Sequence, residues 1–288
     1  QVNIAGFGAA YFQSCYLEQL SPIKTHHLSE LRTILSTGSP LLGHHFDYIY
    51  ENIKKDIQLA SISGGSDIIS CFALSNPMLP VYRCEIQSLG LGMPVSVFNK
   101  TGVPVFGQKG ELVCTAPCPS MPIKFWNDID GKLYQKAYFN QFPNVWTHGD
   151  YASITEHQGL IIFGRSDTTL NPSGVRIGSA EIYEQTNKLK EIKACLAVGL
   201  NTHHGEDIVL FVILKHNIIL TEALTLKIKK LIRDNTSAFH VPKKIIAVLE
   251  FPKTANGKIV EIAVKKKLNN EKIDNISEII NPESLEYF

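Results

Sequence analysis

The sequence has no excess of charge of either sign, because 28 lysines and arginines stand against 27 aspartates and glutamates, for a formal net charge of +1. A protein that holds DNA or RNA against competing salt needs a basic field, so nucleic acid is not an expected partner. Long apolar runs are absent too, since the longest, residues 208–214, is far shorter than the roughly 20 residues of a membrane helix. We therefore expect a globular cytosolic protein with no membrane partner, and the composition leaves the oligomeric state open.

Cysteine is sparse and scattered. Six cysteines in 288 residues do not form the dense framework of a small secreted protein, so we expect reduced thiols. Cys114 and Cys118 lie close together, but their spacing is not that of a usual zinc site and no second pair follows, which favours buried apolar side chains. Adjacent histidines occur at 26–27, 44–45 and 203–204. Neighbouring side chains point apart on a helix or strand, so we expect exposed positions rather than metal ligands.

The pattern of secondary structure changes after about residue 166. Before it, short strands punctuated by glycine and proline are expected at 32–36, 58–63, 94–98, 111–116 and 160–163, with a helix at 48–55. After it, helices at 180–191, 222–233 and 258–268 and strands at 193–200, 208–215 and 244–249 indicate a compact α+β unit. The glycines and proline of 164–174 suit a hinge between the two. Because the chain opens inside an amphipathic segment at 9–20, we expect it to begin within a domain.

Residues 61–67, SISGGSD, follow an expected strand. Backbone amides exposed by Gly64 and Gly65, together with the Ser66 hydroxyl, suit a phosphate, and the Asp67 carboxylate suits Mg²⁺. A strand-to-helix turn would use similar residues. Taken alone, the segment is compatible with either interpretation.

Two further segments carry charged residues in turns. In the first, His148-Gly149-Asp150-Tyr151, Asp150 is placed to accept hydrogen bonds from a diol, although a turn aspartate would look the same. The second, 164–182, combines two arginines, an aspartate and three glycines ahead of an expected helix. Arginine forks suit phosphates and ribose hydroxyls, whereas surface ion pairs at a domain boundary are the alternative.

Residues 252–258, PKTANGK, match a nucleotide P-loop only in part. The segment has one of the two required glycines, and Ile259 stands where serine or threonine would bind magnesium. A Walker loop is therefore excluded. What remains is Lys258, presented by a tight turn at the start of an expected helix, or simply a solvated surface charge.

Taken in order, these segments resemble the adenylate-forming superfamily of acyl-CoA synthetases, luciferases and peptide-synthetase adenylation domains. The resemblance is most specific in GRSDTTLNPSGVRIGSAEI at 164–182 and PKTANGK at 252–258, because both motifs and their separation match. It implies an α/β + α+β architecture: an incomplete large adenylate-forming domain at 1–166, followed by a small mobile α+β carboxyl-terminal domain at 167–288. It also implies a ligase that joins a carboxylic acid to coenzyme A through an acyl-adenylate, using ATP and Mg²⁺.

The resemblance also implies roles for individual residues. Lys258 corresponds to the adenylation lysine, Asp67 to the metal-binding carboxylate and Asp167 to the hinge about which the small domain turns. The remaining positions are expected to bind the nucleotide, at Gly38, Ser39, Pro40, Gly64, Gly65, Ser66, Asp150, Arg165 and Arg176, or coenzyme A, at Ser173, Gly174 and Arg233.

Within the superfamily, SGGSD, THGDYA, AFHVP, NGKIVEIAVKK and the terminal NPESLEYF are most similar to members that activate acetoacetate. Three departures accompany this similarity. No Ser/Thr/Gly-rich phosphate loop ending in Gly-x-Pro-Lys is present, Asp67 replaces the usual glutamate, and Glu261 stands where acetate-using members often carry arginine. Two alternatives therefore stay open: a non-catalytic form that binds nucleotide or coenzyme A, and a ligase for another short acid or a carrier-protein thiol.

Overall fold

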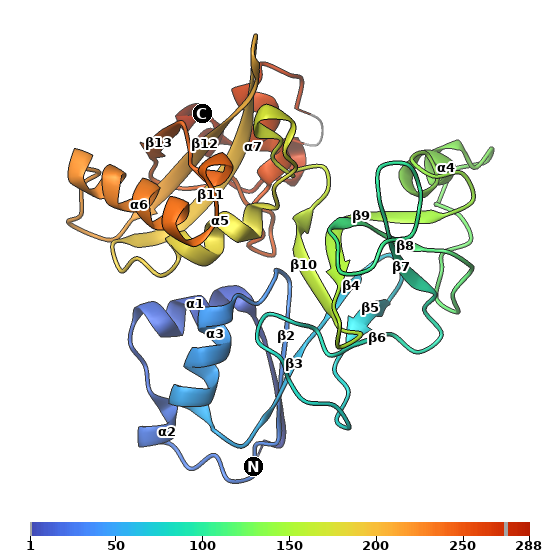
Figure 1. Ribbon diagram of the computed structural model, residues 1–288, viewed down its shortest axis with the longest axis horizontal. Coiled ribbons are helices and arrows are strands. Elements are labelled where there is room, and N and C mark those ends of the chain that lie inside the picture. Colours follow the sequence, from blue (N-terminus) through green and yellow to red (C-terminus); the bar gives the residue numbers. More distant parts are fainter. Residues whose placement is uncertain (1, 274–275) are drawn as a thin grey trace. The chain divides into compact units, whose positions relative to one another are not determined.

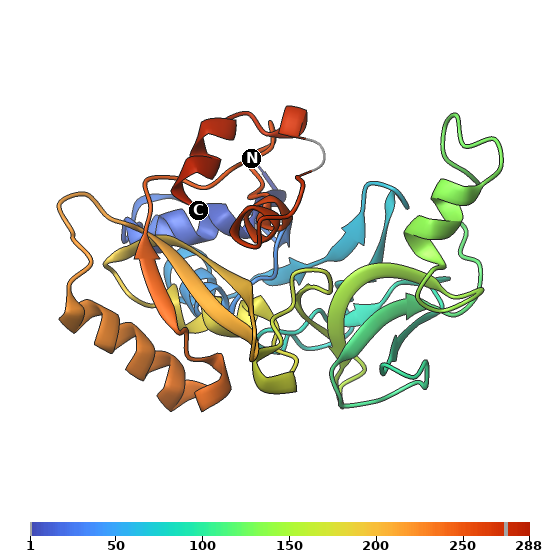
Figure 2. The same cartoon turned by 90° about the horizontal axis from the view of Figure 1, so that it is seen from above.

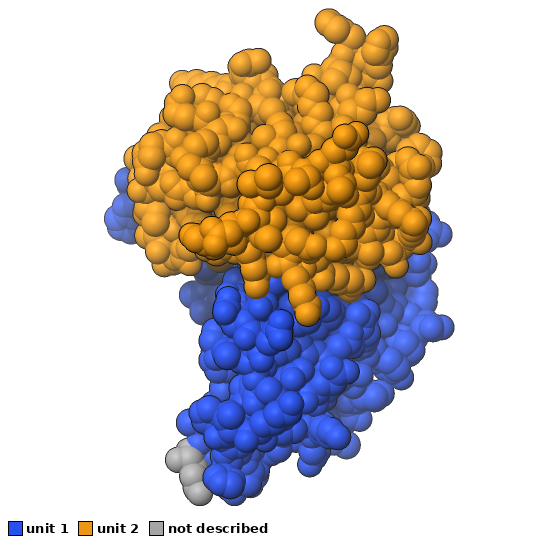
Figure 3. All heavy atoms as spheres, turned by 90° about the vertical axis from the view of Figure 1, so that its left-hand side faces the viewer, with its two compact units in different colours: residues 1–166 blue, residues 167–288 orange. Residues whose placement is uncertain are grey.

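The computed structural model describes residues 2–273 and 276–288. The chain divides into two compact units, unit 1 at residues 1–166 and unit 2 at residues 167–288, which are coloured separately in Figure 3. Each unit has hydrophobic cores of its own. Among the described residues, no helix combines the length and hydrophobicity needed to cross a bilayer.

Unit 1 begins with a three-stranded parallel sheet in the order β1-β2-β3. Its strands are β1 (Ile4–Gly8), β2 (Thr33–Thr37) and β3 (Gln58–Ser61). The connecting segments contain α1 (Ala9–Leu17), α2 (Pro22–Thr25), α3 (Gly43–Tyr48) and the π-helical turn η1 (Ile49–Ile53). Figure 1 shows α1 and α3 together on one side of β2 and β3. Phe12, Ile34, Ile49 and Leu59 form the core between these helices and the sheet, as expected for strands joined by crossover helices.

Two antiparallel sheets complete unit 1. One contains β4 (Ser63–Gly65), β5 (Ser70–Leu74) and β6 (Ser88–Leu89) in that order. The other has the order β10-β9-β8-β7, with β7 (Val95–Phe98), β8 (Gly110–Cys114), β9 (Trp146–Ile154) and β10 (Leu160–Arg165). Helix α4 (Lys132–Tyr138) precedes β9. Phe72, Leu112, Trp146 and Leu160 belong to one buried cluster, so the two sheets share a core.

Unit 2 is built on a three-stranded sheet in the order β11-β12-β13. β11 (Ile192–Thr202) and β12 (Gly205–Leu214) are antiparallel, and β13 (Lys244–Ala247) runs parallel to β12. The helices are α5 (Ser179–Thr186), α6 (Glu222–Asn235) and α7 (Glu261–Leu268). Short 3-10 turns lie at η2 (Pro172–Gly174), η3 (Ala238–His240), η4 (Ile276–Glu278) and η5 (Pro282–Tyr287).

Both faces of the unit 2 sheet are covered. Leu210 and Val212 of β12 cluster with α5 and α6, whereas Val209 and Phe211 cluster with α7. Figure 2 shows α6 and α7 on opposite sides of this sheet. A strand buried on both faces needs apolar residues at consecutive positions, which explains the apolar run at 208–214. The α+β prediction for this part of the chain is confirmed.

Several predicted elements end elsewhere than expected. The helix predicted at 180–191 stops at Thr186, and residues 188–191 turn into β11. The helix predicted at 258–268 begins only at Glu261, so Lys258 precedes it. The helix predicted at 48–55 covers only the π-helical end of a longer segment that starts at Gly43. Asp150, expected in a turn, lies within strand β9.

The prediction that His44 and His45 are exposed was wrong. Both side chains are buried, and each Nε2 lies within hydrogen-bond distance of Gln13 Oε1, at 2.7 and 2.8 Å. Burial, followed by the charge of His44, lowers the pKa of His45 to about 3, so this ring is neutral. The remaining pairs, at 26–27 and 203–204, are exposed as predicted. All six cysteines are free, and Cys114 and Cys118 are buried.

Candidate functional site

Two of the predicted segments lie at one edge of the parallel sheet. Gly38, Ser39 and Pro40 follow β2, and the glycine pair of residues 63–67 follows β3. Because β2 and β3 are parallel, their carboxyl ends meet at the same edge, where open α/β sheets characteristically bind ligands. Gly38 has a φ of +93°, which suits glycine as the residue that turns the chain away from β2.

The glycine pair belongs to a hairpin rather than to a turn into a helix. Gly64 and Gly65 end β4, residues 66–69 turn, and β5 begins at Ser70. A Cβ on Gly64 would lie 2.1 Å from the Ser70 carbonyl oxygen, and one on Gly65 would lie 2.1 Å from Asp67 Oδ1. Glycine is therefore required at both positions by space. Ser66 is exposed at the tip of this hairpin.

Asp67, His148 and Asp150 come together although the first lies far from the others in sequence. His148 Nδ1 is 2.6 Å from Asp150 Oδ2, and His148 Nε2 is 3.4 Å from Asp67 Oδ1. All three side chains are largely buried. The arrangement is a carboxylate–imidazole–carboxylate row in which each ring nitrogen faces an acceptor.

Arg165 closes this row at the Asp150 end. It is the residue across from Asp150 in the β9–β10 pairing, and its Nη1 lies 3.4 Å from Asp150 Oδ1 and donates to the His148 carbonyl oxygen at 3.0 Å. Gly149, with a φ of +85°, leaves the space that the guanidinium uses, since a Cβ there would lie 2.7 Å from Arg165 Nη2. The Arg165 side chain remains 47% exposed, so the guanidinium reaches the surface at this end of the row.

At the other end of the row, Tyr138 donates its hydroxyl to Asp67 Oδ2 at 2.8 Å. The Tyr138 ring stacks on Trp146 with centroids 3.6 Å apart. Trp146 holds the Tyr138 ring in place, and the Tyr138 hydroxyl fixes the orientation of the Asp67 carboxylate. Sequence reasoning missed both Tyr138 and His148. For His148 a signal existed, because residues two apart on a strand share a face, whereas nothing in the sequence connects Tyr138 to Asp67.

The charged groups of the row shift one another's pKa values. Burial alone would lower the pKa of His148, but the hydrogen bond to Asp150 and the charges of Asp150 and Asp67 outweigh burial and the opposing Arg165, and this pKa is raised. Burial alone would raise the pKa of Asp67, but Tyr138 and His148 together lower it. Burial and the bond to Asp67 raise the pKa of Tyr138. The surroundings therefore favour the charged forms of His148 and Asp67.

A metal ion fits this site only with ligands from elsewhere. Within residues 2–273 and 276–288, no cluster of three or more histidine, cysteine, aspartate or glutamate side chains could hold one. Asp67 offers one carboxylate. Its Oδ1 already faces the Ile68 amide at 3.1 Å and His148 Nε2 at 3.4 Å, whereas Oδ2 keeps a lone pair beyond the bond from Tyr138. Magnesium commonly binds in this way, through one or two carboxylates plus water and substrate phosphates.

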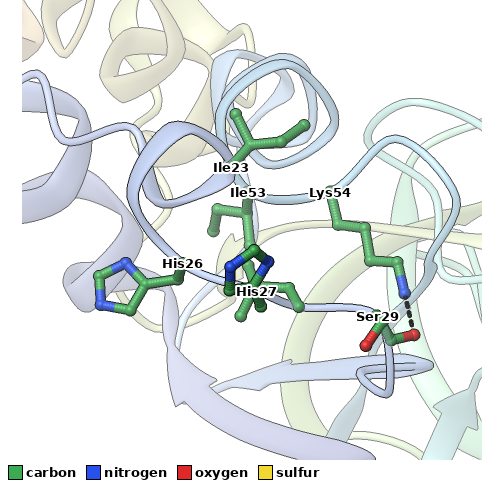
Figure 4. Close-up of a pocket in the computed structure, with 7 residues that line it drawn as sticks. Ile23, His26, His27, Ser29, Ile53 and Lys54 are labelled. Atoms are coloured by element: carbon green, nitrogen blue, oxygen red, sulfur yellow. Dashed lines mark hydrogen bonds between the residues drawn. The ribbon is translucent and has the colours of Figure 1, made fainter.

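A surface cavity of about 240 Å³ lies elsewhere in unit 1. Figure 4 shows its lining, where Lys54 donates to the Ser29 carbonyl oxygen at 2.9 Å and His26 and His27 lie nearby. These residues directly precede β2 and β3, so the cavity is at the amino edge of the parallel sheet. Residues 38–40 and 64–67 follow the strands at the carboxyl edge, and the cavity is therefore not part of the candidate site.

In unit 2, Lys258 lies in a short turn closed by the bridge between Lys253 and Ile259. Thr254 accepts from the Gly257 amide at 2.8 Å and donates its own amide to the Lys258 carbonyl oxygen at 2.9 Å. Asn281 Oδ1 accepts from the Lys253 amide at 2.9 Å. The Lys258 side chain is exposed, and among the described residues no carboxylate lies within ion-pair distance of it, so its charge is available to a ligand.

The other unit 2 candidates lie in loops and at a helix end. The bridge between Leu170 and Ile177 closes a loop that carries Ser173, Gly174 and Arg176. Ser173 and Gly174 adopt positive φ values of 52° and 83°, and Arg176 Nε donates to Thr169 Oγ1 at 3.0 Å. Arg233 is exposed in the last turn of α6.

Asp167, the predicted hinge residue, is tied to α7. Its carbonyl oxygen accepts from Lys265 Nζ at 2.9 Å. One turn earlier on the same helix, Glu261 accepts from the Tyr183 hydroxyl at 3.3 Å. Burial raises the pKa of Glu261, partly offset by hydrogen bonds from Thr168 and Tyr183, and the charge of Asp167 raises it further. Sequence reasoning noted Glu261 only as a departure and missed these contacts.

A domain family and several known proteins are similar in sequence to this chain. The family model for the AMP-binding enzyme C-terminal domain matches residues 181–258. An acetoacetyl-coenzyme A synthetase from Rhizobium meliloti (strain 1021) is 52% identical over 99% of this chain and 44% of its own length. An acetoacetyl-CoA synthetase from Gallus gallus is 45% identical over 100% of this chain and 43% of its own length.

A solved structure, acetoacetyl-CoA synthetase from Streptomyces lividans, superposes with a TM-score of 0.90 at 39% identity, covering 99% of this chain and 44% of that one. The chain thus spans less than half the length of the relatives it matches. The aligned length extends through both units, since it covers 99% of this chain. The chain therefore belongs to the adenylate-forming acyl-CoA synthetase family.

Proposed function

We propose that this chain is the carboxyl-terminal part of an ATP-dependent ligase that joins acetoacetate to coenzyme A. The observation that carries the proposal is the similarity of the whole chain to acetoacetyl-CoA synthetases at 45–52% identity. The Asp67–His148–Asp150–Arg165 row, which begins in the hairpin that follows β3, also supports nucleotide binding because it gathers hydrogen-bonding groups beside a glycine-rich turn. Six free cysteines agree with a cytosolic setting.

The reaction has two steps. A carboxylate oxygen of acetoacetate attacks the α-phosphorus of ATP, an acyl-adenylate forms, and pyrophosphate leaves with the bonding electron pair. The sulfur of coenzyme A then attacks the acyl carbonyl carbon, the thiol proton is lost, and AMP leaves. Both reactants of the first step are anions, so a cation held between them lowers the barrier electrostatically. We assign this role to Lys258, whose exposed charge is free of ion pairs with described carboxylates.

Unit 1 residues bind the nucleotide in this proposal. Asp150 accepts from the ribose hydroxyls with the lone pairs that His148 and Arg165 leave open. Gly64, Gly65 and Ser66 face the phosphates, and Gly38, Ser39 and Pro40 flank the base. Asp67 would hold Mg²⁺ together with the substrate phosphates, and the ion would supply positive charge that lowers the negative charge on the phosphate oxygens. Both Asp67 oxygens already accept hydrogen bonds, which holds the carboxylate in one orientation for the ion.

Unit 2 residues serve the second half of the reaction. Arg176 contacts phosphate, Ser173 and Gly174 contact the coenzyme A arm, and Arg233 contacts one of its phosphates. Asp167 is the hinge about which unit 2 turns between the steps. The positive φ of Ser173 and Gly174 supports a close backbone approach to a ligand, because this conformation turns successive amides outward.

The test is acetoacetate-driven ATP–pyrophosphate exchange. We would measure this chain alone and a fused protein in which it follows the part of the Rhizobium meliloti relative that it does not cover. Exchange by the fused protein with acetoacetate, and not with acetate, propionate or butyrate, supports the proposal. No exchange with any of these acids overturns it, and exchange with a different acid changes the substrate.

Lys258→Ala in the fused protein tests the assigned lysine. We expect a loss of about 100-fold or more in exchange, the size expected on removing a preorganised charge from a transition state. Conversion of synthetic acetoacetyl-adenylate to the thioester should be retained. Lys230→Ala, at an exposed position on α6, is the control and should exchange normally. Undiminished exchange in Lys258→Ala would show that another residue neutralises the approaching carboxylate.

A further inference from the structure

His148 links two functional carboxylates that no strand pairing connects. Strand β9, which carries His148 and Asp150, pairs with β8 and β10, whereas Asp67 follows β4, which pairs with β5. His148 and Asp67 are 81 residues apart in sequence. The imidazole spans the gap, with Nδ1 2.6 Å from Asp150 Oδ2 and Nε2 3.4 Å from Asp67 Oδ1.

The surroundings are built for this contact. Gly65 has no side chain where a Cβ would lie 2.6 Å from His148 Nε2 and 2.1 Å from Asp67 Oδ1. Phe72 packs against the imidazole with ring centroids 4.8 Å apart. Tyr138 holds the second oxygen of Asp67 at 2.8 Å. Each carboxylate therefore has one oxygen facing the imidazole and the other held by a different residue.

We propose that His148 is a positioning residue that fixes the ribose-binding carboxylate, Asp150, relative to the metal-binding carboxylate, Asp67. This inference rests on the proposed function for the roles of the two carboxylates, but not for the contacts between them. The His148 imidazole is rigid and sets the distance between the two carboxylates. Ribose recognition by Asp150 and metal binding by Asp67 therefore both depend on this imidazole. Positioning of this kind matters because small displacements of binding groups are costly in catalysis.

The contact of His148 Nδ1 with Asp150 and the contact of His148 Nε2 with Asp67 can be removed separately. In His148→Asn the amide nitrogen replaces Nδ1, so the bond to Asp150 is retained and the contact with Asp67 is lost. In His148→Gln the amide nitrogen replaces Nε2, with the opposite outcome. Each variant of the fused protein would be assayed by ATP–pyrophosphate exchange for its KM for ATP and for 2′-deoxy-ATP, its half-saturating Mg²⁺ concentration and its maximal rate.

We expect His148→Asn to keep the preference for ATP over 2′-deoxy-ATP and to need several-fold more Mg²⁺. His148→Gln should lose about tenfold of that preference, the effect of losing one hydrogen bond to a charged group, and should keep its Mg²⁺ requirement. The change in nucleotide preference should be larger than the change in Mg²⁺ requirement, because the His148–Asp150 contact is shorter than the His148–Asp67 contact. His216→Asn, at an exposed loop position, should change neither quantity. Equal changes of both quantities in both variants would overturn the proposal.

A second measurement does not depend on catalysis. The two ring nitrogens of His148 would be observed by ¹⁵N NMR in ¹⁵N-histidine-labelled fused protein. Asp150→Asn should shift the Nδ1 signal and Asp67→Asn the Nε2 signal, and a ring that responds to only one of the substitutions would overturn the link. If both signals respond but the unmodified protein performs no exchange, the positional inference stands and the proposed function fails.

Discussion

The two units differ in how completely they bury their apolar side chains. In unit 1, Leu91 is 99% exposed, Trp126 92% and Ile123 90%. In unit 2 the most exposed large apolar side chains are less open, at 77% for Leu249 and 75% for Ile219 among the described residues. The sheets differ in the same way. Helices cover both faces of β12, whereas Ile4 on β1 is 61% exposed. Unit 2 thus has the features of an independent domain, and unit 1 those of part of a larger one.

The candidate residues differ accordingly. In unit 1, Asp67 and Asp150 are joined through His148 in a largely buried row, so a change in one displaces the others. Those of unit 2 lie in exposed turns on a closed core, where Lys258 and Ser173 can change without disturbing packing. Substitutions in unit 1 are therefore expected to combine effects on folding and on binding, whereas those in unit 2 should separate the two.

The largest effect is expected on cutting the chain between Ser166 and Asp167. Residues 167–288 should form a monomer that unfolds cooperatively, because their cores are complete within the unit. Residues 1–166 should self-associate and bind a hydrophobic dye, because of the apolar side chains exposed there. Size-exclusion chromatography, dye fluorescence and calorimetry would measure this. If residues 1–166 formed a monomer that binds no dye and unfolds cooperatively, the contrast in burial between the two units would be contradicted.

A smaller but still large effect is expected for Gly65→Ala. The added methyl group would lie 2.1 Å from Asp67 Oδ1 and 2.6 Å from His148 Nε2, so the row must separate. We expect a loss of about 2–3 kcal/mol in the free energy of unfolding, as for an overpacked core, measured by urea denaturation of the fused protein. Ser66→Ala, at the exposed neighbouring position, is the control and should lose little stability. Equal stability of the two variants would mean that the hairpin adapts to the methyl group.

The sequence was informative where a local pattern determines the structure. The strand at 208–215 and the helix at 222–233 were predicted correctly because each follows from the local spacing of its own apolar residues. Residues 63–67 were located correctly after a strand, but the two glycines are needed to admit Ser70, Asp67 and His148, of which His148 comes from a distant part of the chain. His44 and His45 were predicted wrongly because Gln13, their partner, lies on another helix. Long-range partners have no local signal, and Tyr138 was missed for this reason.

A moderate, pH-dependent effect is expected within unit 2. Burial raises the pKa of Glu261 above the ordinary 4.5. Between 4.5 and the raised value the folded state binds more protons than the unfolded state, so stability is complete at lower pH and falls as pH rises through this window. Glu261→Gln should remove this decline, as measured by urea midpoints of residues 167–288 from pH 4 to 8.

Glu191 provides a control of opposite sign in the same unit. A hydrogen bond from Lys227 holds the pKa of Glu191 below its ordinary value, so its contribution is present at higher pH and lost as pH falls through that lowered value. Glu191→Gln should therefore flatten the acid side of the stability profile and leave the decline above pH 4.5 in place. Identical pH profiles for the two variants would contradict the assignment of Glu261.

The smallest effect is expected in the turn that presents Lys258. Gly257 has a φ of +76°, yet no atom lies within 4 Å of where its Cβ would be. Its substitution should therefore cost backbone strain alone, about 1 kcal/mol for alanine and less for asparagine, which tolerates this conformation better. Urea denaturation of residues 167–288 would measure the difference. Equal losses for alanine and asparagine would show that contacts, and not φ, limit position 257, and the contrast with Gly65 would then disappear. If the prediction holds, a site residue in unit 2 is constrained by its own backbone, and one in unit 1 by its neighbours.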